Sequence, residues 1–416
     1  MMFRSVALSA LLVAGVDASF EKVADRFTPL TSVTDHSAVS VDQTVFKAQL
    51  QDMTQMSFAA AKKVYVEGGN SKSVAAVQVT GGLPSDVAAN SKFTGRGTDG
   101  SDITLTAYTS AEENDVGLQL KYGTSEVTAD HLDCRVGGLP VSDRKIIGCL
   151  VNEGTLIMDG SSTPITYKYD LTENNFNERT LQGFSTKTNK SMRPNGGGPY
   201  FKIFQDFVDY YGTNLYADKI VMAALDGTDT PDLAMGRVDI SSNNIGFDGR
   251  VEVAKKGTAY LNTGMYVLRE LYDAIDDCNR LCKPGSCNDD SAVHALDEAV
   301  VFYHGTDDNL YHSLAQKRCA NFGTCDNLSK GYAKVNSNVF DSFNKMQSFL
   351  QQGECAKAEP IIDEIAAQMW VPLIQGTLRY AWSLDRNNNP AEPTNVEKAA
   401  GEGAIFAAGI LPVIHK

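Results

Sequence analysis

The residues best suited to chemistry lie between His294 and His304. His294, Asp297 and Glu298 stand at positions i, i+3 and i+4, so a helix would place all three on one face. An imidazole and two carboxylates can hold a hard or borderline metal ion, as facing helices do in carboxylate-bridged metal bundles. The same spacing also fits a solvated acidic face, because Asp and Glu favour the first turn of a helix. Spacing alone leaves both interpretations open.

A second acidic face is predicted upstream, where Glu270, Asp273 and Asp277 recur at helical spacing. Tyr260 precedes them on the same predicted helix, and Tyr303 belongs to the segment of His294. Ferric iron lowers the pKa of a phenol and binds the resulting phenolate, so tyrosines are candidate ligands. The chain has 16 tyrosines, and the alternative for each is an ordinary place in the core. The predicted metal ligands are Glu270, His294, Asp297, Glu298, Tyr260 and Tyr303.

Two arginines are candidates for binding an anion that completes the coordination shell of a metal. Guanidinium groups match the planar geometry of carbonate and carboxylates, and Arg318 and Arg379 are our choices. The alternative for either arginine is a salt bridge to one of the 51 acidic residues.

Helices are the elements that must position most of these side chains. After Pro199 the apolar residues recur at helical spacing, and an earlier helix is predicted from Val45 to Val66. From about 77 to 180, β-prone runs separated by Gly, Asn and Asp predict a small antiparallel sheet instead. The predicted later helices cover about 251–278, 292–303, 309–322, 338–350 and 358–383.

The predicted fold is therefore α+β, with a C-terminal α-helical bundle and an N-terminal or inserted small antiparallel β module. A chain of 416 residues is long enough for two such units. We divide it into a signal peptide (1–19), an N-terminal helical segment that we assign to the bundle (20–75), a β-rich module (76–180) and a disulfide-stapled helical domain (181–416).

The N-terminus is typical of a secretory signal peptide. Arg4 supplies a positive charge, Val6 to Val16 form an apolar run, and Ala18 and Ser19 are small residues that suit cleavage. An oxidising secretory route favours disulfides, and the even number of cysteines fits that expectation. These cysteines are Cys134, Cys149, Cys278, Cys282, Cys287, Cys319, Cys325 and Cys355.

Cysteine spacing suggests some local pairs. Cys134 and Cys149 most simply pair with each other. The group from Cys278 to Cys287 resembles a zinc knuckle, although the Pro284-Gly285 turn favours stapled loops. Two sequons, Asn189-Lys-Ser and Asn327-Leu-Ser, permit glycosylation.

Composition limits the partners. With 37 Lys+Arg and 51 Asp+Glu the net charge is −14, which repels nucleic acids and anionic lipid surfaces and favours cations. No run approaches the roughly 20 apolar residues of a membrane span, so no transmembrane anchor is expected. The sequence also lacks a Gly-rich phosphate loop, a Gly-x-Ser-x-Gly elbow and a His-Glu-x-x-His helix, which disfavours the common enzyme classes.

Five ordered stretches resemble the algal iron-assimilation family, which comprises high-CO2-inducible periplasmic proteins of green algae and is related to the phytotransferrins of diatoms. Together they cover roughly residues 199 to 385, and the resemblance depends on their order. They are DYYGTNLYADK (209–219), KGTAYLNTGMYVLRE (256–270), LDEAVVFYHG (296–305), LAQKRCANF (314–322) and VPLIQGTLRY (371–380).

This resemblance implies a secreted or periplasmic microalgal protein that captures Fe(III) for iron assimilation, with carbonate as a companion ligand. Membrane-attached phytotransferrins carry a C-terminal anchor, whereas this chain ends at Lys416 without one. A membrane receptor or a cell-wall component is therefore the expected partner. Phe20 also resembles the residue that directs diatom precursors into plastids, so plastid routing is the alternative localisation.

Our main prediction is a non-enzymatic iron-binding protein, with two alternatives. The same cluster can form the metal site of a periplasmic hydrolase, because His294-x-x-Asp297 approximates a metallopeptidase motif. A non-catalytic protein of the cell surface is the other alternative, in which the acidic residues serve only solubility.

Overall fold

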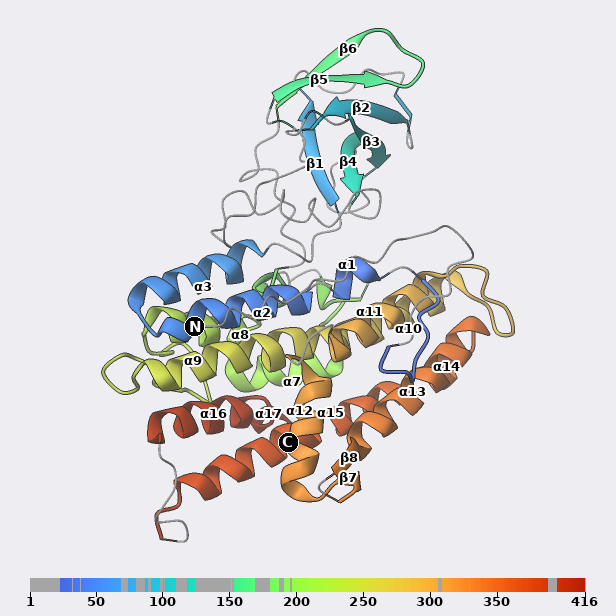
Figure 1. The fold of residues 1–416 in the computed structure, drawn as a ribbon. Helices are drawn as coiled ribbons and strands as arrows, with labels where there is room; N and C mark the ends of the chain where they lie inside the picture. Colours follow the sequence, from blue (N-terminus) through green and yellow to red (C-terminus); the bar gives the residue numbers. More distant parts are fainter. Residues whose placement is uncertain are drawn as a thin grey trace.

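The structure is a computed structural model, and its described part has the α+β architecture expected from the sequence (Figure 1). A large helical domain is combined with a small antiparallel β module. The predicted signal peptide, with Phe20, lies outside the described residues. These are 23–31, 33–37, 39–68, 74–79, 87–88, 91–97, 100, 102–109, 118–123, 151, 153–168, 180–186, 191–194, 197–305, 309–328, 330–387 and 395–415.

The first helices are α1 (Thr34–Ser37), α2 (Val39–Gln49) and α3 (Gln55–Glu67). A single helix over Val45–Val66 was expected, but the chain breaks where Met53 adopts a left-handed conformation (φ 50°). Thr54 then caps α3 in a capping box with Ser57, and these local hydrogen bonds compete with a continuous helix. The three helices pack on later ones, since α1 contacts α11, α2 contacts α9 and α3 contacts α8.

Six antiparallel strands close into a barrel in the order β1-β4-β3-β2-β5-β6, and β6 pairs back to β1. Phe93, Leu105, Leu156 and Tyr167 are buried, because alternate side chains of a strand point to the same side. The strand predicted at Lys145–Cys149 lies outside the described residues. The strands are β1 (Val74–Val79), β2 (Lys92–Arg96), β3 (Asp102–Thr109), β4 (Leu118–Gly123), β5 (Glu153–Met158) and β6 (Pro164–Lys168).

The remaining helices form the helical domain. Buried residues of α2, α3 and the later helices belong to one hydrophobic core. The predicted helix over 251–278 is continuous but contains a π-helical segment, Gly257–Asn262, between α9 and α10. The helices are α5 (Gly183–Thr186), α7 (Lys202–Tyr211), α8 (Tyr216–Asp226), α9 (Phe247–Lys256), α10 (Thr263–Leu281), α11 (Ser291–His304), α12 (Tyr311–Phe322), α13 (Lys334–Gln351), α14 (Cys355–Ala358), α15 (Pro360–Leu384), α16 (Val396–Ala408) and α17 (Leu411–Ile414).

The chain leaves the helical domain for the barrel and returns to it at adjacent points. The amide of Gln182 donates a hydrogen bond to the carbonyl of Tyr65 at 3.0 Å. Gly68 adopts a φ of 61°, and a Cβ there would lie only 2.9 Å from the side chain of Thr180. The buried Asn262 also donates to the hydroxyl of Tyr65 at 2.9 Å. In sequence, the barrel is therefore an insertion whose two ends are held together.

Three disulfides join the six described cysteines. Cys278–Cys355 links α10 to α14, Cys282–Cys287 closes a short loop after α10, and Cys319–Cys325 links α12 to strand β7. β7 (Cys325–Asn327) pairs with β8 (Lys330–Ala333) in a small hairpin. The expected disulfides of this region are confirmed, and the zinc-knuckle alternative is wrong because its thiols are bonded. Cys134, Cys149 and the Asn189 sequon lie outside the described residues.

Within the described ranges, no helix combines the length and the apolar character that crossing a bilayer requires.

Candidate metal centre

α11 carries four of the predicted ligands, and two of them, His294 and Glu298, are in contact. His294 and Glu298 are one helical turn apart, and their Nε2 and Oε1 atoms lie 3.0 Å from each other. Ala295, Leu296, Ala299 and Phe302 are buried, so the apolar side of α11 faces the core as predicted. The two polar side chains consequently lie at the edge of the core.

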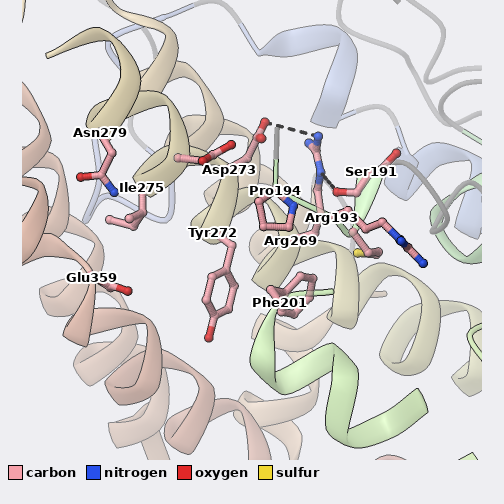
Figure 2. Close-up of a pocket in the computed structure, with 12 residues that line it drawn as sticks. Ser191, Arg193, Pro194, Phe201, Arg269, Tyr272, Asp273, Ile275, Asn279 and Glu359 are labelled. Carbon is pink, nitrogen blue, oxygen red and sulfur yellow. Dashed lines mark hydrogen bonds and ion pairs between the residues drawn. The ribbon is translucent and has the colours of Figure 1, made fainter. Parts of the chain in front are cut away.

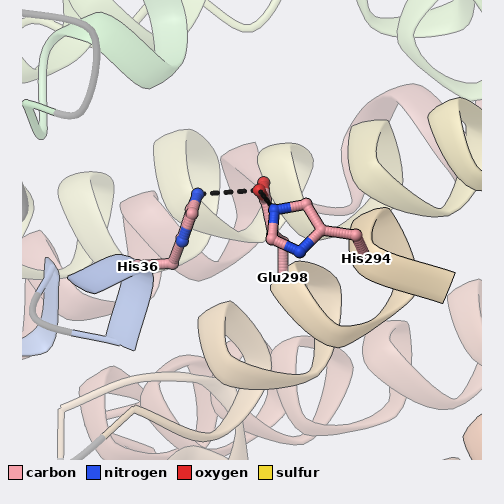
Figure 3. A group of neighbouring side chains, drawn as sticks. All are labelled: His36, His294 and Glu298. Carbon is pink, nitrogen blue, oxygen red and sulfur yellow. Dashed lines mark ion pairs between the residues drawn. The ribbon is translucent and has the colours of Figure 1, made fainter. Parts of the chain in front are cut away.

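His36 on α1 completes the group (Figure 3). Its Nε2 lies 2.7 Å from the same Oε1 atom of Glu298, and only 5% of its surface is exposed. One potential ligand atom from each of His36, His294 and Glu298 lies within 4.8 Å of the other two. Sequence reasoning missed His36, because a lone histidine in a four-residue helix carries no spacing signal that links it to α11.

The geometry of the three atoms fits a small metal ion after a slight adjustment. Ligands at about 2.0–2.1 Å in a tetrahedral site are roughly 3.3 Å apart. The two nitrogens of His36 and His294 now contact the Glu298 oxygen at 2.7 and 3.0 Å, so small shifts would open the required space. Without a metal, protons on the imidazole nitrogens must occupy these contacts, and a bound metal ion would replace them.

A hydrogen-bonded chain behind His294 orients its ring. The Thr31 hydroxyl donates to Oδ2 of Asp297 at 2.8 Å, which leaves the Thr31 oxygen to accept from Nδ1 of His294 at 2.9 Å. Because Nδ1 keeps a proton for Thr31, Nε2, which contacts Glu298, is the nitrogen whose proton a bound metal ion would displace. Metal-binding histidines commonly receive such support from behind.

Asp297 lies on α11 with His294 and Glu298, and its Oδ2 is engaged by the N-terminal segment. Its Oδ2 accepts hydrogen bonds at 2.8 Å from the amides of Leu30 and Thr31 as well as from the Thr31 hydroxyl. Burial raises the pKa of this carboxyl, and the hydrogen bonds from Thr31 and Leu30 oppose that shift. Asp297 thus fastens the N-terminal segment to α11, and this attachment brings His36 within reach of His294.

Glu270 on α10 is buried beside the group but bonded elsewhere. Its Oε2 accepts from Nη1 of Arg269 at 2.6 Å, and its Oε1 has no hydrogen-bond partner among the described residues. Burial raises the pKa of Glu270 to about 8, with Arg269 opposing the shift and Glu298 and Asp273 adding to it. The influence of Glu298 indicates that Glu270 is an electrostatic neighbour of the centre.

The two candidate phenolates have other surroundings. The hydroxyl of Tyr303, fully buried in the core, donates to Asn336 at 2.7 Å. Burial raises the pKa of Tyr303 well above its usual value, which disfavours a free phenolate. Tyr260 lies in the π-helical segment, where burial raises its pKa to about 12 while Lys256 and Arg318 oppose that shift.

The two candidate anion-binding arginines flank one aromatic ring. The guanidinium carbons of Arg318 and Arg379 lie 5.9 and 6.0 Å from the ring centre of Tyr380. Burial lowers the pKa of Arg318, and the nearby charge of Arg379 lowers it further. Nε and Nη1 of Arg318 are buried without a hydrogen-bond partner among the described residues. The structure therefore brings Tyr260 and Arg318 together electrostatically, in surroundings different from those of His294 and Glu298.

Comparison of the chain with protein-family models, curated proteins and solved structures gives no match. The assignment of the candidate site therefore depends on the geometry of its residues alone.

Proposed function

We propose that this protein binds a transition-metal ion through His36, His294 and Glu298. The observation that carries the proposal is the meeting of two imidazole nitrogens and one carboxylate oxygen within 4.8 Å. The chain from Asp297 through Thr31 to Nδ1 of His294 supports it, since this chain leaves Nε2 available as a ligand.

Iron is our first choice of metal, because the sequence resemblance implies it and imidazole with carboxylate suits iron as well as zinc. The role would be capture or delivery of iron by a protein of the secretory route. We expect no tyrosinate colour from this ligand set, because the Tyr303 hydroxyl donates to Asn336 and Tyr260 lies near Lys256 and Arg318 instead of the three ligands. Carbonate at Arg318 and Arg379 stays a separate part of the proposal, since these arginines surround Tyr380 and not the three ligands, and bicarbonate titration with and without iron tests it.

Metal titration tests the proposal. Chelator-treated protein is titrated with Fe(II) under anaerobic conditions, with ferric citrate with and without bicarbonate, and with Zn(II), and bound metal is counted by elemental analysis. We expect one ion per chain, and its loss in His36→Ala, His294→Ala and Glu298→Gln. His415→Ala serves as the matched control, since His415 is exposed near the C-terminus. Stoichiometric binding that survives all three ligand substitutions would refute the site.

A metal-dependent hydrolase is the second candidate. Two histidines and a glutamate are the protein ligands of several zinc peptidases, in which water occupies the fourth position. Here the three candidate ligands likewise leave a tetrahedral position open. Peptide and ester substrates are incubated with the zinc-loaded protein and with the Glu298→Gln variant. Hydrolysis that requires both zinc and Glu298 would favour this function over iron capture.

We also propose secretion, which the three disulfides support. Expression with the native N-terminus in a eukaryotic secretory host, followed by intact-mass analysis, tests it. The expected product is found in the medium and begins near Ser19 or Phe20. Retention of an uncleaved chain inside the cells would contradict the proposal.

A further inference from the structure

α15 exposes large apolar side chains along one face. Ile374, Leu378 and Trp382 follow one another at intervals of four residues, so they share one side of the helix. Their exposed fractions are 38%, 56% and 59%. A surface helix commonly presents charged or polar residues to water on such a face. In Figure 1 the C-terminal half of α15 lies at the outer edge of the helical domain.

The apolar face continues toward the start of α15. Ala367 is exposed and Val371 is partly exposed, and both lie on the side of Ile374. Between Glu364 and Arg379, every exposed residue of this helix is apolar. An extended apolar surface of this kind marks a contact with another molecule. We call it the apolar stripe, which consists of Ala367, Val371, Ile374, Leu378 and Trp382.

The N-terminal end of α15 is negatively charged. Asp363 and Glu364 are exposed there, and Glu364 pairs with Lys345 at 3.6 Å. Figure 2 shows Glu359 at the start of the helix, beside a pocket of about 200 Å³ that Tyr272 also lines. Burial raises the pKa of Tyr272 to about 12, and Asp363 and Glu359 add to that shift. The carboxylates thus create a negative field at this end.

The C-terminal end of α15 has the opposite sign. Arg379 and Arg386 are exposed there. Burial lowers the pKa of Arg318 on the neighbouring α12, and the charge of Arg379 lowers it further. Asp385 adds one negative charge, and its Oδ1 accepts a hydrogen bond from the amide of Asn387 at 3.0 Å. The end therefore keeps a net positive charge.

We propose that the apolar stripe pairs with the same stripe of a second copy of this chain, with the two helices antiparallel about a two-fold axis. Centred near Ile374, this pairing places Val371 opposite Leu378 and Ala367 opposite Trp382, so smaller side chains meet larger ones. The acidic end of each helix then lies over the basic end of the other. This charge complementarity favours a second copy as the occupant and selects the antiparallel orientation.

The size of the stripe predicts a weak dimer. A helix of 25 residues is about 37 Å long, and one of its faces buries less than the roughly 800 Å² per partner of a standard interface. The net charge of −14 on each copy opposes association at low salt, but at 0.1 M salt charges are screened beyond about 10 Å. We therefore expect reversible association with a dissociation constant of about micromolar size near physiological salt. It does not depend on the metal proposed at His36.

Sedimentation velocity of the full-length protein without added metal tests the proposal. Over a roughly hundredfold range of concentration the wild type should shift from monomer to dimer. Ile374→Glu places two like charges together near the axis and should raise the dissociation constant at least about tenfold. Ile157→Glu makes the same change at a similarly exposed residue of β5 and should leave it unaltered. Both variants are checked for native thermal unfolding.

A cysteine near the axis tests the symmetry. Because Ile374 faces its own copy in the proposed pair, Ile374→Cys should give a covalent dimer on mild oxidation, whereas Ile157→Cys should not. A wild type that stays monomeric at every concentration, or a dimer that survives Ile374→Glu, would overturn the proposal. Monomers that bind phosphatidylcholine vesicles through Ile374 would also overturn it, because the stripe would then contact lipid.

Discussion

The hydroxyl oxygen of Thr31 lies 2.9 Å from Nδ1 of His294. This contact joins a residue of the N-terminal segment to the first turn of α11, a helix that follows much later in the chain. Because the same hydroxyl donates to Asp297, the proton on Nδ1 has a defined place, and Nε2 is the nitrogen that a metal ion would bind. The proposed metal centre therefore depends on a residue that is not itself a ligand.

Replacing Thr31 tests this dependence. Thr31→Val keeps the shape of the side chain but removes the hydroxyl, so the orientation of His294 is lost. We expect metal affinity to fall roughly 10- to 100-fold, as is typical when a partner behind a metal ligand is removed. Thr31→Ser retains the hydroxyl and should keep most of the affinity. Competition titration with a chromogenic chelator measures both, and equal affinities in the two variants would contradict the prediction.

Asp297 should influence stability as well as metal binding. Asp297→Asn removes the charge from an oxygen that accepts three hydrogen bonds, and we expect a loss of about 1–3 kcal/mol in the free energy of unfolding. Amide exchange near residues 30–36 should accelerate, because this carboxylate holds that segment. Asp326→Asn, at an exposed position of β7, is the control and should change stability by less than about 0.5 kcal/mol.

Glu270 should make stability depend on pH. Its pKa is about 8 in the folded protein against an ordinary value of 4.5, so the folded state binds the proton more tightly than the unfolded state does. The resulting stabilisation is complete below pH 4.5 and is lost as the pH rises toward 8. Glu270→Gln should therefore be more stable than the wild type at pH 8, by more than about 1 kcal/mol, and show a flatter profile.

Urea unfolding at several pH values measures this effect of Glu270. The exposed variant Glu364→Gln provides the comparison, and its profile should follow that of the wild type. A wild type that gains stability between pH 5 and pH 8 relative to Glu270→Gln would show that the carboxylate, and not the acid, is the favoured buried form.

The disulfides should differ in their contribution to stability. Cys278 and Cys355 are 77 residues apart, whereas Cys282 and Cys287 are separated by 5. In the chain-entropy description a longer closed loop restricts the unfolded state more, and the difference between these loops is about 2 kcal/mol. Paired Cys→Ala replacement at 278 and 355 should therefore lower the melting temperature more than replacement at 282 and 287. Equal losses in thermal unfolding would argue against the entropic explanation.

Sequence periodicity predicted the α+β class and most helices of the second half of the chain. The helical repeat of apolar residues is a local property that can be read within each segment. It placed His294 and Glu298 on one face of α11, and the structure has them in contact. It did not predict the break at Met53, where a capping box outweighs the apolar pattern. The closed order of the barrel was also beyond it, since strand pairing is a long-range property.

The composition of the candidate site was harder to predict than its location. His36 meets α11 through contacts between distant segments that no local pattern encodes, among them the hydrogen bonds of Leu30 and Thr31 to Asp297. Asp297 has the spacing of a ligand on α11, yet its Oδ2 is occupied by the amides of Leu30 and Thr31. Tyr303 likewise has a suitable residue type, but its hydroxyl is committed to Asn336.

The hydrogen bond between Tyr65 and Gln182 has a consequence for how this protein can change. Because the two ends of the insertion are adjacent, a short turn can span them. A deletion or replacement of the inserted segment can therefore remove or exchange the whole barrel. His294 and Glu298 lie beyond the insertion and His36 lies before it. Such an exchange would leave the residues of the candidate metal centre in place.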